Sequence, residues 1–187
     1  MVTRAPGPIV RGALRAPASL YDGHLGWILG ERFLLLTHVG RRSGRRYRTM
    51  LEVIGRDDAR GELMVMAGLG RSAQWYRNLK ASPASEVAVG RRRFVSTHRE
   101  LEPHEAAAVL ARYERRNRWL APVLDRVLSA LVGWRYDGSE DARRRLVAEL
   151  PVIALAPVGS PLASTGTAGR SSLAPGKTAY PAESPVA

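Results

Sequence analysis

The stretch RFLLLTHVGRRSGRRYRTMLEVIG (residues 32–55) decides the fold. Residues 32–39 form a compact apolar run that is typical of a β-strand, and residues 47–55 form a second strand-like run. Between them, residues 40–46 contain two glycines and a serine among arginines, a composition that predicts a turn. We therefore expect the two runs to pair as a β-hairpin whose connection is strongly cationic.

The pattern of strands and helices continues toward the C-terminus. Further strands are predicted over 62–67, 86–89, 92–101 and 151–157, with turns at 56–61 and 90–91. Helices are predicted over 19–30, 73–80 (with Ser72 as the N-cap), 103–117, 120–131 and 139–150. Five or six mainly antiparallel strands with peripheral helices indicate an α+β fold, and the number of strands suits a small β-barrel.

The length of 187 residues suits one domain with its own core. Residues 158–187 are rich in Ser, Thr, Gly, Pro and Ala, and residues 1–15 are similar in composition. Such segments bury too little apolar surface to offset the entropy lost on ordering. We therefore predict a folded domain over 16–157, between a disordered N-terminal arm (1–15) and a disordered tail (158–187).

Composition excludes several kinds of chemistry. The absence of cysteine rules out disulfides, thiolate zinc sites, iron–sulfur clusters and a cysteine nucleophile. His24, His98 and His104 lack metal-ligand spacing, so no metal site is predicted. His38 lies late in an apolar strand, and we interpret it as a core or rim histidine with satisfied hydrogen bonds rather than as a catalytic base.

The net charge of +12 predicts an anionic partner. No zinc-finger spacing, RNA-recognition motif or heptad zipper is present, so no specific nucleic acid is predicted as that partner. Neither a signal peptide nor an apolar run of about 18 residues is found, which favours a cytoplasmic protein. Peripheral contact with a membrane and formation of a homodimer both stay open.

The strongest candidate site is the turn itself, because five of the eight residues 41–48 are arginines. Like charges this close repel one another, and a bound anion would relieve the repulsion. Gly44 would let the backbone approach such an anion and Ser43 would donate a hydrogen bond, although a solvated turn is the alternative. The spacing is not that of a phosphate-binding P-loop.

A second candidate lies on the predicted helix after the third strand. Trp75 and Asn78 are three residues apart and therefore share one face of that helix. A tryptophan beside an amide donor could line a flat heterocycle. The alternative is that Trp75 and Leu79 simply pack in the core.

Together, these motifs resemble the deazaflavin-dependent nitroreductase family of the flavin/deazaflavin oxidoreductase superfamily. The resemblance rests on LLLTHVGRRSGRRYRTMLEVI (34–54), MVMAGLG (64–70), QWYRNLKASP (74–83), VAVGRRRF (87–94) and PVIALAP (151–157). It implies a split β-barrel like that of the pyridoxine-phosphate oxidases. It also implies a groove for coenzyme F420, whose phosphate and glutamate tail are anionic.

The resemblance also implies roles for individual residues. The turn would hold the phosphate and carboxylates, the ends of two strands would approach the deazaflavin ring through backbone groups, and the helix would supply the family's Trp-x-x-Asn. Relatives carry a lysine after the third strand, a charge that an arginine would have to supply here. The expected cofactor-binding residues are Arg41, Arg42, Ser43, Gly44, Arg48, Thr49, Ala67, Gly68, Arg71, Trp75 and Asn78.

Two positions depart from the family pattern. Arg46 stands where relatives often have proline, and Glu52 stands in the second strand, where the nitroreductase members have a tyrosine-lined acceptor pocket. The identity of the acceptor therefore does not carry over. No catalytic residue is assigned, and Tyr47, Tyr136 or water stay open as the proton donor.

The sequence thus predicts an F420-dependent oxidoreductase that transfers a hydride between the deazaflavin and a small organic acceptor, which would be a quinone, a nitro compound or an activated alkene. One alternative is an oxidoreductase on the same barrel that uses FMN or FAD. The other is a non-catalytic basic protein that binds nucleic acid or a membrane surface.

Overall fold

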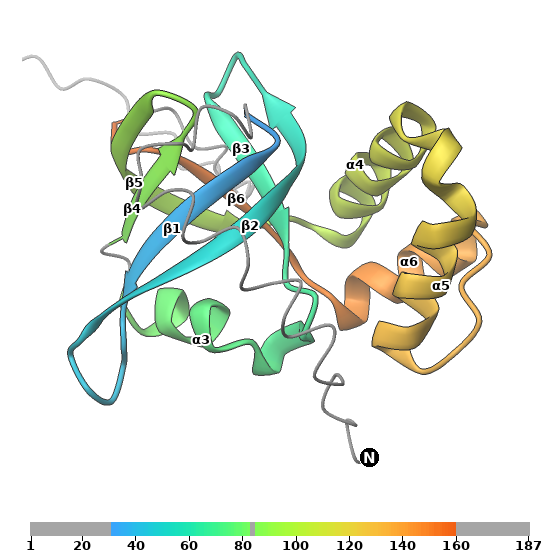
Figure 1. Cartoon of the computed structure of the whole chain (residues 1–187), viewed down its shortest axis with the longest axis horizontal. Helices are drawn as coiled ribbons and strands as arrows, with labels where there is room; N and C mark the ends of the chain where they lie inside the picture. The colour runs from blue at the N-terminus through green and yellow to red at the C-terminus, as the bar shows by residue number, and fades with distance from the viewer. Residues whose placement is uncertain (1–30, 83–84, 160–187) are drawn as a thin grey trace, which may run out of the picture.

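The computed structural model describes residues 31–82 and 85–159, which form a closed barrel of six antiparallel strands flanked by helices (Figure 1). The strands pair in the order β1-β2-β3-β6-β5-β4. This confirms the predicted α+β split barrel and fixes the number of strands at six. The strands are β1 (Phe33–Val39), β2 (Arg46–Asp57), β3 (Glu62–Met66), β4 (Ser85–Val89), β5 (Arg92–Glu100) and β6 (Val152–Pro157).

Among the described residues, four α-helices surround the barrel, and each agrees with a predicted helix within one or two residues at its ends. In Figure 1, α3 lies across one end of the barrel, below β1 and β2, while the other three helices pack together on one side. The predicted helix over 19–30 falls outside the described residues. The helices are α3 (Gln74–Ala81), α4 (Pro103–Arg116), α5 (Ala121–Val132) and α6 (Glu140–Glu149), with 3-10 turns η2 (Gly70–Ser72) and η3 (Arg118–Leu120).

The start of α3 differs from the prediction. Ser72 belongs to η2 and its hydroxyl donates to the carbonyl of Leu69 at 2.7 Å, so it does not cap the helix. The N-cap is Ala73, which makes no side-chain capping bond. The reason is local, because the 3-10 turn Gly70–Ser72 comes before the helix and moves the N-cap position one residue along the chain.

Two large hydrophobic cores and one small cluster hold the described part of the chain together. The first fills the barrel, where Leu34, Leu36 and Val65 meet Trp75 and Leu79 from α3. The second lies between the outer face of the barrel and α4–α6. Both β1 and β2 are apolar on both faces instead of alternating, because Ile54 of β2 packs under the helices and Leu35 of β1 is buried against Met50 and Ala88 of the neighbouring strands. The apolar run that predicted the first strand therefore reflects burial on both sides.

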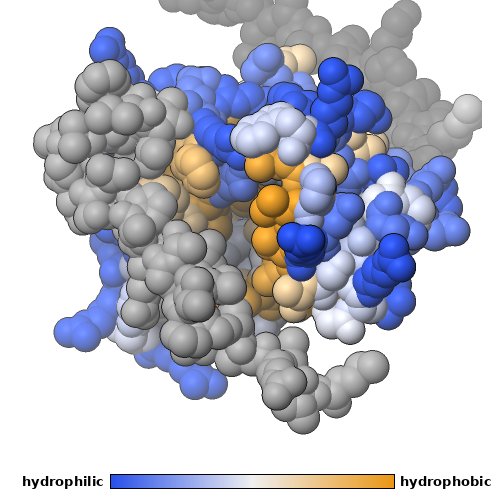
Figure 2. All heavy atoms as spheres, turned by 45° about the vertical axis from the view of Figure 1, so that its right-hand side comes forward, coloured by the Kyte–Doolittle hydropathy of each residue, from blue (hydrophilic) through white to orange (hydrophobic). Residues whose placement is uncertain are grey.

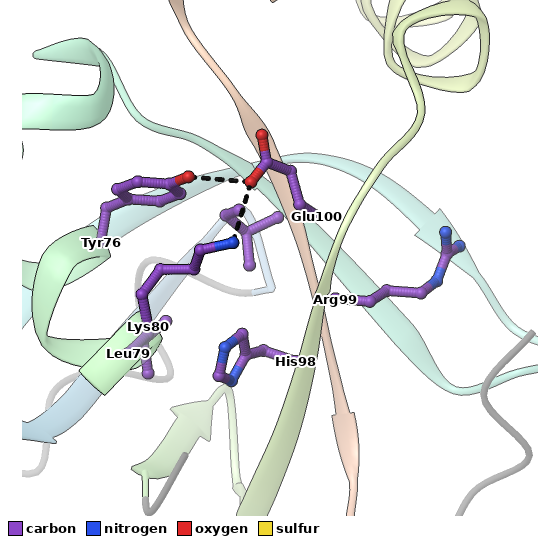
Figure 3. Close-up of a pocket in the computed structure, with 7 residues that line it drawn as sticks. Tyr76, Leu79, Lys80, His98, Arg99 and Glu100 are labelled. Carbon is purple, nitrogen blue, oxygen red and sulfur yellow. Dashed lines mark hydrogen bonds and ion pairs between the residues drawn. The ribbon is translucent and has the colours of Figure 1, made fainter. Parts of the chain in front are cut away.

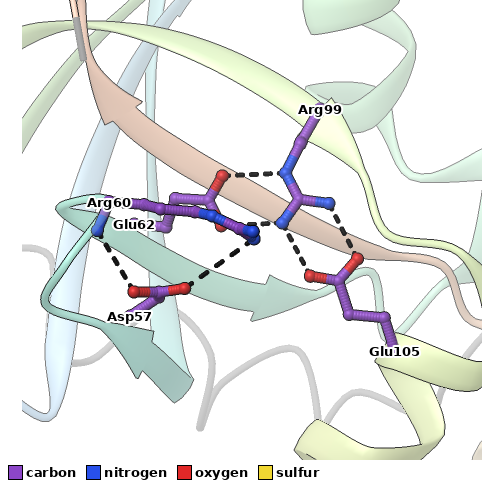
Figure 4. Close-up of polar contacts among 5 residues, drawn as sticks. All are labelled: Asp57, Arg60, Glu62, Arg99 and Glu105. Carbon is purple, nitrogen blue, oxygen red and sulfur yellow. Dashed lines mark hydrogen bonds and ion pairs between the residues drawn. The ribbon is translucent and has the colours of Figure 1, made fainter. Parts of the chain in front are cut away.

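An ion-pair network lies on β3, β5 and α4 (Figure 4). Glu62 is fully buried, and both of its oxygens accept from Arg99 at 2.7–2.8 Å. Arg99 also donates twice to Glu105, which lies at the start of α4. The guanidinium thus fastens α4 to the barrel, and the two carboxylates hold the pKa of Arg99 above its usual value despite desolvation.

Candidate functional site

A large cleft opens between the barrel and the helices, with a volume of about 840 Å³. Its walls come from the β1–β2 hairpin, the segment after β3, α3, α4 and α5. Figure 2 shows apolar side chains gathered in the hollow beside the helices, with hydrophilic side chains around them. A cleft of this size is within the range of small-molecule and cofactor sites.

The basic turn forms one rim of the cleft. The turn is closed by backbone bonds from Gly40 N to Arg45 O and from Gly44 N to Gly40 O, both 2.8 Å. A Cβ on Gly40 would lie 2.5 Å from the ring of Tyr47, so any larger residue there would push the ring out of its place. The Tyr47 hydroxyl in turn lies 3.1 Å from Ser43 Oγ. These contacts fix the turn while its arginine side chains stay at the surface.

Arg41 links this turn to α3 by hydrogen bonds to two uncharged side-chain amides. Its Nη1 donates to Gln74 Oε1 at 3.0 Å and to Asn78 Oδ1 at 2.9 Å. Desolvation and the guanidinium groups of Arg77 and Arg42 lower the pKa of Arg41, although it stays a cation. Among the described residues, Arg41 and Arg42 have no carboxylate at ion-pair distance. The rim therefore carries positive charge that the described chain does not neutralise.

A buried polar chain continues from Asn78 along the wall of the cleft. Asn78 and His38 are 5% and 3% exposed, and the Asn78 amide nitrogen lies 3.0 Å from His38 Nδ1. The other ring nitrogen, Nε2, lies 3.2 Å from Thr49 Oγ1. Desolvation lowers the pKa of His38, so the imidazole is neutral at pH 7. His38 is thus a satisfied histidine, as expected, but it also lines the cleft.

The opposite part of the cleft is apolar. Leu124, Leu128 and Leu131 from α5 line it, together with Ile54 and Met66 from the barrel. Its polar groups are few. Tyr113 of α4 donates to Glu52 at 2.8 Å, and desolvation, with the hydrogen bond and charge of Glu52, raises the pKa of Tyr113 to about 12. The phenol therefore stays protonated throughout the physiological range.

The structure brings most of the predicted site residues into this one cleft. Eight of the eleven line it: Arg41, Arg42, Ser43, Arg48, Thr49, Gly68, Trp75 and Asn78. Gly44 lies in the turn without lining the cleft, with a φ of 65°, and Ala67 is fully buried in the barrel core. Arg71 lies on the other side of α3, where it bonds to Glu100 and to the Tyr76 hydroxyl.

That side of α3 has a small pocket of about 180 Å³ (Figure 3). Glu100 lines it, accepting from Tyr76 at 2.8 Å and pairing with Lys80 at 3.5 Å. His98 also lines the pocket, and its buried Nδ1 has no hydrogen-bond partner in the described part of the chain. Because Trp75 and Asn78 face the cleft while Tyr76 and Lys80 face this pocket, α3 separates the two.

Several residues of the cleft were not predicted from the sequence. The apolar residues of α5 have the spacing of an ordinary amphipathic helix. Tyr113 continues the buried stripe of α4, so its pattern is that of a core residue. Of the two tyrosines considered as proton donors, Tyr47 lines the cleft. Tyr136 does not, because it is buried and donates its hydroxyl to Glu114.

Within the described parts of the chain, no three histidine or acidic side chains come close enough together to hold a metal ion. The helices in these parts are also too short or too polar to cross a lipid bilayer.

Comparison with known proteins places the chain in a family. Residues 18–122 match the model of the F420H(2)-dependent quinone reductases. F420H(2)-dependent quinone reductases from two strains of Mycobacterium tuberculosis are each 35% identical over 98 residues, which is 49% of this chain and 65% of theirs. This chain therefore spans less than two thirds of these relatives. A solved F420-H2 dependent reductase matches 67% of this chain and 95% of its own, with 20% identity and a TM-score of 0.38. Because the family model covers more than half of its residues, the chain belongs to the F420H(2)-dependent quinone reductase family.

Proposed function

We propose that this protein binds coenzyme F420 in the large cleft and reduces a quinone with it. The observation that carries the proposal is the contrast between the ends of the cleft, one cationic and one apolar. A coenzyme with an anionic tail fits the first end and a lipophilic acceptor fits the second. The relatives' activity supports the same assignment.

The residues present suit the coenzyme. Arg41 and Arg42 lack carboxylate partners among the described residues, so they can meet phosphate and carboxylate groups without breaking an existing ion pair. Ser43, Gly44 and Arg48 would complete this anion site. Thr49, Gly68, Trp75 and Asn78 would contact the deazaflavin ring, next to Ala67. Arg71 would reach the coenzyme only by leaving Glu100.

When bound, the reduced deazaflavin supplies a hydride. The protein's own contribution is to hold the ring and the acceptor in register and to exclude water from between them. The apolar side chains of α5 would cover the acceptor and favour a quinone over a more polar nitro compound or activated alkene. Tyr47 and water stay the candidates for the proton donor.

Binding of F420 tests the anion site. We expect Arg42→Ala to weaken F420 binding about tenfold, because a charge-assisted hydrogen bond contributes roughly 1.5 kcal/mol. The matched control is Arg118→Ala, which removes the same charge from an exposed residue outside the cleft. Fluorescence titration at two salt concentrations measures both. Equal effects of the two substitutions would mean that only overall charge matters, and tighter binding of FMN than of F420 would refute the choice of cofactor.

Steady-state kinetics tests the acceptor site. Leu131→Gln makes the apolar end polar, so we expect a higher KM for a naphthoquinone and unchanged F420 affinity. A nitro compound and an activated alkene serve as competing acceptors in the same assay. Faster reduction of either by the unmodified protein would contradict the preference for quinones.

We further propose that the exposed face of α5 and η3 rests on an anionic membrane. Trp119, Val123 and Val127 are 72%, 56% and 49% exposed, and Val127 also lines the cleft. Arg115, Arg118 and Arg126 are exposed beside them, with no ion-pair partner in the described residues. This combination of apolar and basic side chains favours an anionic lipid surface, from which a lipophilic quinone could enter the cleft.

Sedimentation with vesicles tests the contact. Replacing the three arginines by serine should weaken binding to phosphatidylglycerol vesicles roughly a hundredfold, at about 1 kcal/mol per charge near the surface. Replacing Arg91, Arg92 and Arg93, on the β4–β5 turn and β5, is the control for net charge. Equal losses for the two variants would contradict the assigned surface.

A further inference from the structure

In each of the four hydrogen bonds around Asn78 and His38, the chemistry of the groups determines which atom donates and which accepts. The backbone N–H and the Nη1 of Arg41 both donate to Asn78 Oδ1, at 3.2 and 2.9 Å. Neither of these groups can accept a hydrogen bond, so the amide oxygen must face Arg41. The orientation of the Asn78 amide is therefore fixed, and its NH2 group must face His38.

This orientation selects one tautomer of His38. Because the Asn78 amide donates toward Nδ1, that nitrogen must accept, and the single proton of the neutral imidazole is on Nε2. Nε2–H then donates to Thr49 Oγ1. Since the Thr49 oxygen already accepts this bond, its own hydroxyl proton is directed elsewhere. Among the described residues the Thr49 side chain bonds to His38 alone, and Thr49 lines the cleft, so that proton is available to a bound molecule or to solvent.

The surroundings of His38 oppose its protonation. An imidazolium would turn Nδ1–H toward the amide N–H of Asn78, setting two donors against each other. The uncharged groups packed against the ring are Tyr47 and Ser85 from the neighbouring strands, with Thr49 and Asn78. The charged side chains within two residues of these groups in the chain, taken with Arg41, are cationic except for Glu86: Arg41, Arg45, Arg46, Arg48, Arg77 and Lys80.

We infer that His38 is a positioning residue that, held by Asn78, orients the Thr49 hydroxyl to donate a hydrogen bond to an acceptor atom of the cofactor ring. The inference rests on the proposed function, because it assumes that the ring lies against this wall. It connects the two parts of the site, since the chain of bonds begins at Arg41 on the basic rim and ends at Thr49 inside the cleft. A bound anion and a correctly oriented ring would thus depend on the same residues.

Imidazole ¹⁵N NMR of the protein without any ligand tests the direction of the bonds. We expect the His38 signals to show a protonated Nε2 and an unprotonated, hydrogen-bonded Nδ1. In Asn78→Asp both terminal atoms are acceptors, so the proton should move to Nδ1 or the ring should become an imidazolium at neutral pH. A protonated Nδ1 in the unmodified protein would overturn the inference.

A double-mutant cycle on F420 affinity tests the positioning role. Thr49→Val keeps the shape but removes the hydroxyl, and should weaken binding about five- to tenfold, whereas Thr49→Ser should retain it. His38→Leu should weaken binding several-fold in the unmodified protein and not further in the Thr49→Val background. His38→Gln can still accept from Asn78 and donate to Thr49, so it should restore most of the affinity. Losses from His38→Leu that are equal in both backgrounds would overturn the inference.

The two measurements separate the possible failures. If the unmodified protein does not bind F420, the proposed function fails and the role of Thr49 fails with it, whatever tautomer the spectrum shows. If F420 binds and Arg42→Ala weakens it, but Thr49→Val does not, the proposed function stands and only the positioning role is refuted. Thermal melting of each variant checks that a lost affinity is not lost folding.

Discussion

Asn78→Ala should destabilise the fold far more than the same change at a neighbouring amide. Asn78 is 5% exposed and makes three hydrogen bonds, two from Arg41 and one to His38. A neutral hydrogen bond contributes about 0.5–1.5 kcal/mol and a bond to a charged group more. The Arg41 guanidinium keeps Gln74 and solvent as partners, so its bond is counted at the low end. The expected loss is about 2–3 kcal/mol in the free energy of unfolding.

Gln74→Ala is the matched control, because Gln74 lies on the same helix and accepts from the same Nη1 of Arg41. Gln74 is exposed, so its loss should cost less than about 0.5 kcal/mol. For a chain of this size, Asn78→Ala should then lower the Tm by roughly 4–12 °C and Gln74→Ala by under 2 °C. Melting curves and urea denaturation measure both. If the two variants have the same Tm, burial and the additional bonds of Asn78 contribute nothing to stability, and the prediction is refuted.

Three further predictions concern other parts of the barrel. Arg99→Leu should cost about 3–5 kcal/mol in urea denaturation, because it leaves the buried Glu62 carboxylate without its partner, and a loss below 1 kcal/mol would contradict this. Gly70→Ala should cost roughly 1–3 kcal/mol in thermal melting, because φ is +60° and the new Cβ would lie 2.8 Å from a backbone carbonyl oxygen. Tyr113→Phe should remove a phenol that titrates near pH 12 in ultraviolet absorbance. Since the pKa of Tyr113 is raised in the fold, its contribution to stability is present below pH 10 and is lost as the pH rises toward 12. If the substitution removed absorbance that titrates near pH 10 instead, the bond to Glu52 would be excluded.

The sequence predicts the fold well where one physical effect dominates. The apolar runs at 32–39 and 47–55 correspond to β1 and β2 because burial on both faces leaves little else for them to form. The helical spacing of Trp75 and Asn78 likewise predicts a shared face, since it depends only on the geometry of α3. Ser72 was misassigned because a 3-10 turn precedes α3 and moves the N-cap position to Ala73, and a pattern of residue types does not show such a turn.

The cleft itself is harder to predict, because it depends on segments that meet only in the folded chain. Leu124, Leu128 and Leu131 have the spacing of any amphipathic helix, and nothing in that spacing distinguishes a cleft wall from a core. His38 is a similar case. A histidine in an apolar strand predicts hydrogen-bond partners in general, but its tautomer depends on an amide 40 residues away in the chain.

Helix α3 has to hold Asn78 accurately, and the contacts on its other face provide for this. Tyr76 and Arg71 both bond to Glu100 of β5, at 2.8 and 2.7 Å, and Lys80 pairs with the same carboxylate. These bonds fasten both ends of the helix to the barrel wall opposite the cleft. A rotation of α3 that moved the Asn78 amide away from Arg41 would also pull Tyr76 and Lys80 from Glu100. One short helix thus carries residues of both the small pocket and the cleft, and its bonds to Glu100 help to hold Asn78 in place.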